Sequence, residues 1–139
     1  MSYGFTDMLA AERRRPGMFG LRTLSETIAF INGYDSGVHG ALLQGFREWL
    51  QVRLGARSSY DWSSLAVYIA LPDTDGPRRL TAEQEAVATD AMFELLDQFL
   101  ADRSRRDGLL DTYLRFHAAC DEWDARLRRE PDEADESRP

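Results

Sequence analysis

At 139 residues, of which 43% are hydrophobic and 11% aromatic, the chain is long enough to bury a core without disulfides or metal, and this composition excludes an intrinsically disordered protein. Its formal net charge of −7 argues against binding to nucleic acid or to an anionic membrane, and no apolar run approaches the roughly 18 residues that a membrane-spanning helix needs. The basic residues are all arginine, and the one cysteine, Cys120, has no disulfide partner within the chain, so we expect a cytoplasmic protein.

The first predicted helix is TDMLAAERRR, with Thr6 as its N-cap and with acids early and arginines late, as the helix dipole favours. Pro16 and Gly17 should end it. We expect Met18, Phe19 and Leu21 to enter the core. Three adjacent arginines fan around a helix and cannot converge on one ligand, so ERRRPGMFG is interpreted as a helix stop with an apolar anchor.

The second predicted helix opens with Thr23 and Glu26 in a capping-box spacing. Gly33 and Gly37 around GYDSG then indicate a turn. A third helix is predicted over 38–54, ended by a glycine at position 55. The expected core positions of these two helices are Leu24, Ile28, Ile31, Leu42, Leu43, Phe46, Trp49, Leu50 and Leu54.

The segment 64–71, SLAVYIAL, is compatible with a strand because it is rich in β-branched and aromatic residues. A lone strand would have no partner, so a short buried helix is favoured, and a short strand at 64–71 remains the alternative. Thr81 and Gln84 form a second capping box, and the last helix follows Asp107-Gly108. The expected apolar stripes are Ala88, Met92, Leu95, Leu96, Phe99 and Leu100, then Leu110, Tyr113, Leu114, His117, Cys120, Trp123 and Leu127.

The chain is therefore predicted to be all-α, a compact bundle of five or six helices in a single domain over 1–130. The segment 131–139 is acidic, holds no large apolar residue and is expected to form a disordered tail.

The sequence predicts neither an enzyme nor a metal or cofactor site. His117, Cys120 and Asp121 lie within one turn and offer three donor atoms, and Cys120 with His117 also has the residue types of a nucleophile and its base. Both residues fall in an apolar stripe, so we interpret them as packed side chains. No P-loop, HExxH, GxSxG or CxxC motif occurs.

Carboxylates follow the polar side of the helix that begins near position 82: Glu83, Glu85, Asp90, Glu94, Asp97 and Asp102. They form either a solvated face or an acidic strip that binds a basic partner.

Four segments carry a family resemblance: ERRRPGMFG, TLSETIAFINGYDSG, GFREWLQVRLGARSSYDWSS and AMFELLDQFL. Their order is similar to that of small uncharacterised bacterial proteins of the toxin-immunity type, with the pattern R-P-x-M-[YF], G-Y, F-x-x-W-L and F-E-L-L-D-x-F. The resemblance covers residues 12–100. It implies a non-catalytic protein that binds and neutralises a toxin.

An acidic inhibitor suits a basic, nuclease-like toxin, because opposite charges accelerate association. Acids beside aromatic residues in loops are the best anchors, so the predicted partner-binding residues are Tyr34, Asp35, Tyr60, Asp61 and Trp62. Packing at helix corners is the competing interpretation of these five. The alternative function is a helical adaptor or a self-associating protein, such as a homodimer, and a small-ligand binder or hydrolase is less favoured.

Overall fold

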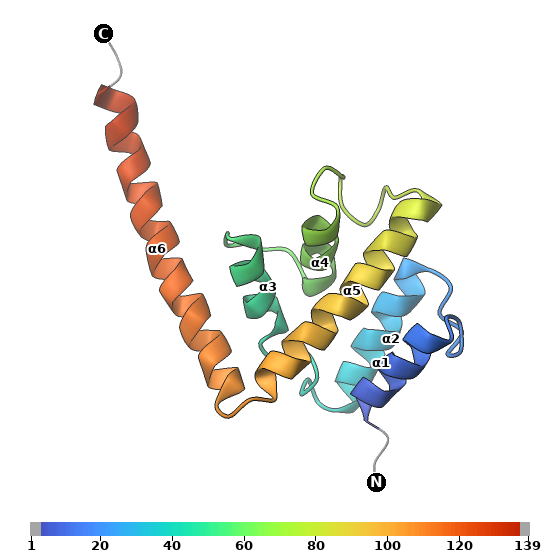
Figure 1. The fold of residues 1–139 in the computed structure, drawn as a ribbon. Helices are drawn as coiled ribbons and strands as arrows, with labels where there is room; N and C mark the ends of the chain where they lie inside the picture. The colour runs from blue at the N-terminus through green and yellow to red at the C-terminus, as the bar shows by residue number, and fades with distance from the viewer. Residues whose placement is uncertain (1–3, 137–139) are drawn as a thin grey trace.

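The computed structural model describes the backbone of residues 4–136 and the side chains of residues 4–129, and within that range it is helical without a strand (Figure 1). The predicted all-α fold is confirmed. The segment 64–71 lies almost entirely in a helix, so the strand alternative is wrong. The helices are α1 (Phe5–Arg14), α2 (Leu24–Gly37), α3 (Phe46–Leu54), α4 (Trp62–Ala70), α5 (Ala82–Arg103) and α6 (Gly108–Glu136).

Helix α5 is the centre of the fold, with α1 and α2 on one side and α3 and α4 on the other (Figure 1). Its residues Met92, Leu96 and Phe99 are inaccessible to solvent. The ring of Phe99 lies 4.9 Å from that of Phe46 on α3. The other inaccessible apolar side chains are Ile31, Leu50, Leu65 and Val67, so α2, α3, α4 and α5 all contribute to one core.

Helix ends follow the predicted caps in most places. Thr81 and Gln84 exchange side-chain-to-backbone hydrogen bonds at 2.9 and 3.2 Å. Thr23 accepts the Glu26 N–H at 3.1 Å, but the Glu26 carboxylate accepts the Arg22 N–H at 3.2 Å, so the capping box predicted there forms only in half. The prediction for Thr6 is wrong. Helix α1 begins at Phe5 with Gly4 as its N-cap, two residues before Thr6, and the carboxylate of Asp7 accepts the Gly4 N–H at 3.1 Å.

The turn predicted at GYDSG is also misplaced, because α2 continues to Gly37 and the chain turns only over 38–45. Polar contacts from two helices hold this loop. Asp35 accepts the Leu43 N–H at 2.9 Å, and Arg103 donates to the carbonyl of Leu42 at 2.7 Å. Burial lowers the pKa of Arg103, and the charge of Asp35 opposes that shift. The residues 38–45 are therefore excluded from α3 by tertiary contacts.

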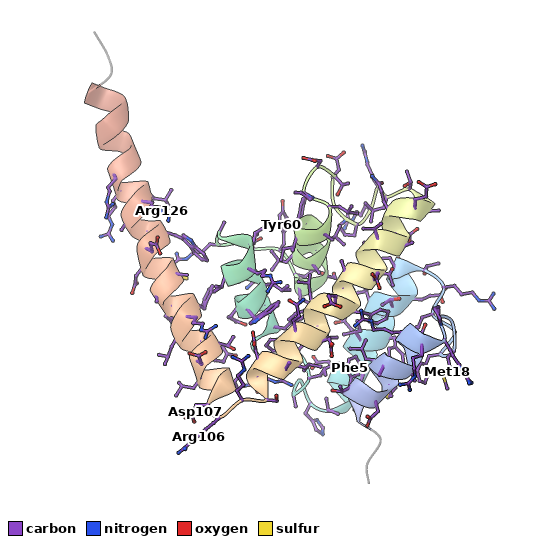
Figure 2. All side chains as sticks on the ribbon, in the orientation of Figure 1. Phe5, Met18, Tyr60, Arg106, Asp107 and Arg126 are labelled. Carbon is purple, nitrogen blue, oxygen red and sulfur yellow. The ribbon has the colours of Figure 1, made fainter. Side chains whose placement is uncertain are left out.

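The loop after α1 is built around the buried carboxylate of Glu12. It accepts the N–H groups of Gly17 at 2.9 Å and of Phe19 at 3.2 Å. Because both neighbours of Met18 are bound this way, Met18 points to solvent and is 55% exposed (Figure 2). The prediction that Met18 enters the core is wrong, whereas Phe19 is half-buried and stacks on Phe30 at 5.9 Å.

Helix α6 stands beside the rest of the fold and projects beyond it (Figure 1). Its 29 residues extend about 43 Å, whereas the 9 residues of α3, its main neighbour, extend only about 14 Å. The helix reaches Glu136; the side chains after 129 and the residues 137–139 lie outside the described part, so the disordered tail over 131–139 stays a prediction.

The face that α6 turns to α3 differs from the predicted stripe. Thr112 and Cys120 are buried, and Phe116 and Trp123 are half-buried. Predicted core residues at three positions of α6 are instead largely exposed: Leu110 and Leu114 at 58% each and Leu127 at 64%. At 3.6 residues per turn, Leu110 and Leu114 lie on a different face from Cys120, whereas Leu127 continues the covered face toward the end of the helix.

Candidate partner-binding surfaces

Tyr34 and Asp35, predicted to contact a partner, make contacts within the chain. The Tyr34 ring lies 4.8 Å from that of Phe5 and joins α1 to α2. Asp35 binds the loop that precedes α3. Both side chains are half-buried. Corner packing therefore accounts for both residues.

Asp61 and Trp62 also have structural contacts at the start of α4. Asp61 caps the helix by accepting the Ser64 N–H at 3.3 Å and the Ser63 hydroxyl at 2.6 Å. Burial raises the pKa of Asp61, but these hydrogen bonds outweigh burial and leave it below its ordinary value of 3.8. The indole of Trp62 donates to Asn32 on α2 at 2.9 Å.

Tyr60 is the one predicted residue that presents a large apolar surface, since it is 53% exposed (Figure 2). Its ring stacks on that of Tyr68 on α4 with the centroids 5.4 Å apart. Its backbone is fixed as well, because Arg47 donates to the carbonyl of Tyr60 at 2.7 Å and to the carbonyl of Ser58. We call Tyr60 and Tyr68 the tyrosine pair.

Charged groups of both signs lie near the tyrosine pair, since Asp75 acts on Tyr68 and the guanidinium of Arg47 bonds the carbonyl of Tyr60. The pKa of Tyr68 is raised, mainly by burial of the ring, and the neighbouring Tyr60 and the charge of Asp75 add to the shift. Gly76 is packed on the hydroxyl of Tyr68, at 3.4 Å from the place that a Cβ atom would occupy. The sequence placed Tyr68 in a segment predicted to be buried, whereas its partner Tyr60 was predicted to bind a partner because it lies in a polar loop.

His117 and Cys120 do not form a site. Cys120 is buried as predicted, but His117 is exposed, so its predicted packing is wrong. The two residues are three positions apart on α6, but Cys120 is buried against the fold and His117 is exposed to solvent. Within the described residues, His, Cys, Asp and Glu side chains nowhere gather in a group of three that could hold a metal ion.

Most carboxylates of α5 bond to other segments of the fold. Glu85 accepts the Leu24 N–H at 3.1 Å, and Asp102 accepts the Trp49 indole N–H at 3.0 Å. Glu94 accepts from Arg13 at 2.8 Å, and the pKa of Glu94 is lowered first by its hydrogen bond from Gln98 and then by Arg13. Most of this side of α5 is therefore engaged with neighbouring helices, which disfavours its use as a continuous acidic strip.

The described part of the chain has grooves between its helices. One, of about 760 Å³, lies between the loop after α1 and the first half of α5, with Leu21, Leu24 and Phe93 in its walls. Another, of about 710 Å³, lies between α3 and the start of α6 and contains the half-buried Trp49. We call the second one the tryptophan groove. Neither groove is lined by His117 or Cys120.

No family model, curated protein or solved structure matches this chain. No helix in the described part of the chain is long and apolar enough to cross a bilayer. The function is therefore argued from the surfaces of the chain itself.

Proposed function

We propose that this chain is a non-catalytic protein-binding module that holds a basic partner protein through the tyrosine pair. The observation that supports this most is the state of Tyr60. It is an aromatic side chain with 53% exposure, yet its ring is stacked and its backbone carbonyl is hydrogen-bonded. A rigid, exposed tyrosine loses little conformational entropy when a partner covers it, which is typical of interface hot spots.

The net charge of the chain favours a basic partner. Asp75 acts on Tyr68 electrostatically, and the chain as a whole carries a net charge of −7. An acidic surface of this kind accelerates association with a basic protein. The resemblance to toxin-immunity proteins suggests that this partner is a toxin of a basic, nuclease-like type, which the module would neutralise by binding.

The test is binding between the purified chain and the product of the neighbouring reading frame, measured by calorimetry. We expect Tyr60→Ala to weaken that binding about 30-fold or more, the usual effect of removing a hot-spot tyrosine. Met18→Ala is the matched control, because Met18 is 55% exposed, close to the 53% of Tyr60, but lies in the loop after α1. Absence of binding at micromolar concentration would refute the toxin partner, and unchanged binding by Tyr60→Ala would refute the tyrosine pair.

A second candidate function, self-association, is favoured by the far end of α6. Trp123 is half-buried and Leu127 is 64% exposed on the part of α6 that extends past α3. Sedimentation over a range of concentrations tests this alternative. A dimer that Leu127→Glu converts to a monomer would support it, whereas a monomer at all concentrations would exclude it.

A further inference from the structure

The tryptophan groove leaves an apolar strip uncovered. Trp49 and Val52 of α3 form one wall, and Leu110 and Leu114 of α6 form the other. The two leucines are one helical turn apart and each is 58% exposed. Because these two side chains stay largely exposed in the monomer, their apolar surface contributes little to folding and is available to pack against a ligand.

The central aromatic side chain of the groove is held in place before any ligand arrives. The indole N–H of Trp49 donates to Asp102 at 3.0 Å, and its ring lies 6.0 Å from that of Phe99 in the core. The guanidinium of Arg53 lies over the same ring, 5.2 Å from its centroid. Tryptophan and arginine in this arrangement are the residue types most enriched at interface hot spots.

The charges that the groove leaves free are mainly positive. Its lining contains Arg53, Arg105, Arg106 and Arg115 against Asp102, Asp107 and Asp111. Asp102 lies 3.6 Å from Arg105, and Asp111 lies 3.0 Å from Arg115, so these four charges pair with one another.

The unpaired charges of the lining are therefore Arg53, Arg106 and Asp107. Arg53 bonds only the neutral side chain of Gln98 at 2.7 Å. Arg106 has no ion pair with any described residue and points away from the helices (Figure 2). The groove thus carries an excess of positive charge in a protein whose net charge is −7.

The turn that carries Arg105 and Arg106 has a fixed geometry. Asp107 has a left-handed φ of 57°, and a Cβ atom on Gly108 would lie 2.4 Å from the Arg103 carbonyl oxygen. Only glycine fits at 108, and the close contact with the end of α5 sets the direction in which α6 leaves. The position of the arginines relative to Trp49 is therefore part of the folded structure.

We propose that the tryptophan groove binds an acidic amphipathic helix of a partner protein. Its apolar face would pack on Trp49, Leu110 and Leu114, and its carboxylates would pair with Arg53 within the groove and with Arg106 at the outer edge of the groove. A helix is favoured over an extended segment because the described chain has no strand edge to which a peptide strand could add. This surface is separate from the tyrosine pair, so the module has a second binding site with the opposite charge preference.

The experiment selects binders from a phage-displayed library of random 16-residue peptides, with the whole chain as the target. We expect the enriched peptides to be acidic and to have apolar residues three and four positions apart. Leu114→Glu and Arg106→Glu should each weaken a synthetic enriched peptide at least tenfold. Val87→Glu and Arg14→Glu are the controls, since both change an exposed residue, one apolar and one arginine, that lies outside the groove.

A second measurement, on the unsubstituted protein, locates the peptide directly. The indole N–H resonance of Trp49, assigned with Trp49→Phe, should shift as the peptide is added, and those of Trp62 and Trp123 should not. Tyr60→Ala should leave peptide binding unchanged, which separates this proposal from the proposed function of the tyrosine pair.

Four outcomes would overturn the proposal. They are a failure to enrich any peptide, enrichment of basic peptides, equal binding to Leu114→Glu, and self-association of the chain that Leu114→Glu abolishes. The last outcome would identify a second copy as the occupant of the groove.

Discussion

Helices α5 and α6 are the two long helices of this protein, with 22 and 29 residues. Both have apolar residues at helical spacing, but these residues differ in how far they are buried. On α5, Ala88, Met92, Leu96 and Phe99 are buried almost completely. On α6, large leucines at three positions are more than half exposed. The difference lies in what surrounds each helix, because α5 packs on α2, α3 and α4, whereas α6 packs mainly on the short α3.

The two helices contribute to different properties, α5 to the stability of the fold and α6 to binding. Apolar area that is buried on folding stabilises the fold, whereas apolar area left exposed beside arginines can act only in contact with another molecule. We therefore expect substitutions in the surroundings of α5 to change the free energy of unfolding, and substitutions on α6 to change binding.

The largest effect on stability should come from Phe99. Phe99→Ala empties a fully buried aromatic site against Phe46 and should lower the free energy of unfolding by about 3–5 kcal/mol. Leu127→Ala, on α6, should change it by less than about 0.5 kcal/mol. Chemical denaturation measures both. Similar losses for the two variants would show that α6 is packed more tightly than its exposure indicates.

The carboxylates of Glu12 and Glu122 should differ in how much they contribute to stability. Glu12→Ala removes the acceptor of two backbone N–H groups in the loop after α1 and should cost about 2 kcal/mol. Glu122→Ala removes only an exposed pair with Arg126 on α6, which contributes about 0.3–0.5 kcal/mol. Equal effects in thermal denaturation would contradict the structural role of Glu12.

The N-cap of α4 gives a smaller effect with a pH signature. Asp61→Ala should cost about 1 kcal/mol at neutral pH. The pKa of Asp61 is lower in the folded chain than its ordinary value, so this stabilisation is present above about pH 4 and is lost as the pH falls through the folded pKa. Asp61→Asn keeps a capping oxygen without the charge. Its stability should therefore lack this contribution to the pH dependence, and an unchanged pH profile would contradict the assignment.

The smallest effect is expected at the tryptophan groove. Leu114→Ala should change the free energy of unfolding by less than about 0.5 kcal/mol, because the side chain is already 58% exposed. Amide hydrogen exchange provides the complementary measurement: amides after Cys120 in α6 should exchange faster than those of Met92 to Phe99 in α5. A loss above 1 kcal/mol, or equal protection of the two helices, would erase the contrast between α5 and α6.

Much of the fold was predictable from local signals. The capping box at Thr81, the glycine at 55 and the apolar period of α5 each depend on residues within a few positions of one another, and the structure confirms them. The candidate binding sites were less predictable. Tyr60 gave a signal because it lies in a polar loop, whereas its partner Tyr68 and the groove residue Arg106 gave none.

Backbone propensity and periodicity along the chain are enough to predict that this protein is helical, where α5 begins and which residues are apolar. The exposure of Met18, the loop at 38–45 and the exposure of Leu127 on α6 follow only from the folded structure. The physical reason is that a periodic pattern defines a face but not its neighbour. The carboxylate of Glu12 fixes the loop at Met18 through N–H groups five and seven positions away. The guanidinium of Arg103 fixes the loop at 38–45 through a carbonyl 61 positions away, and the short length of α3 leaves Leu127 uncovered.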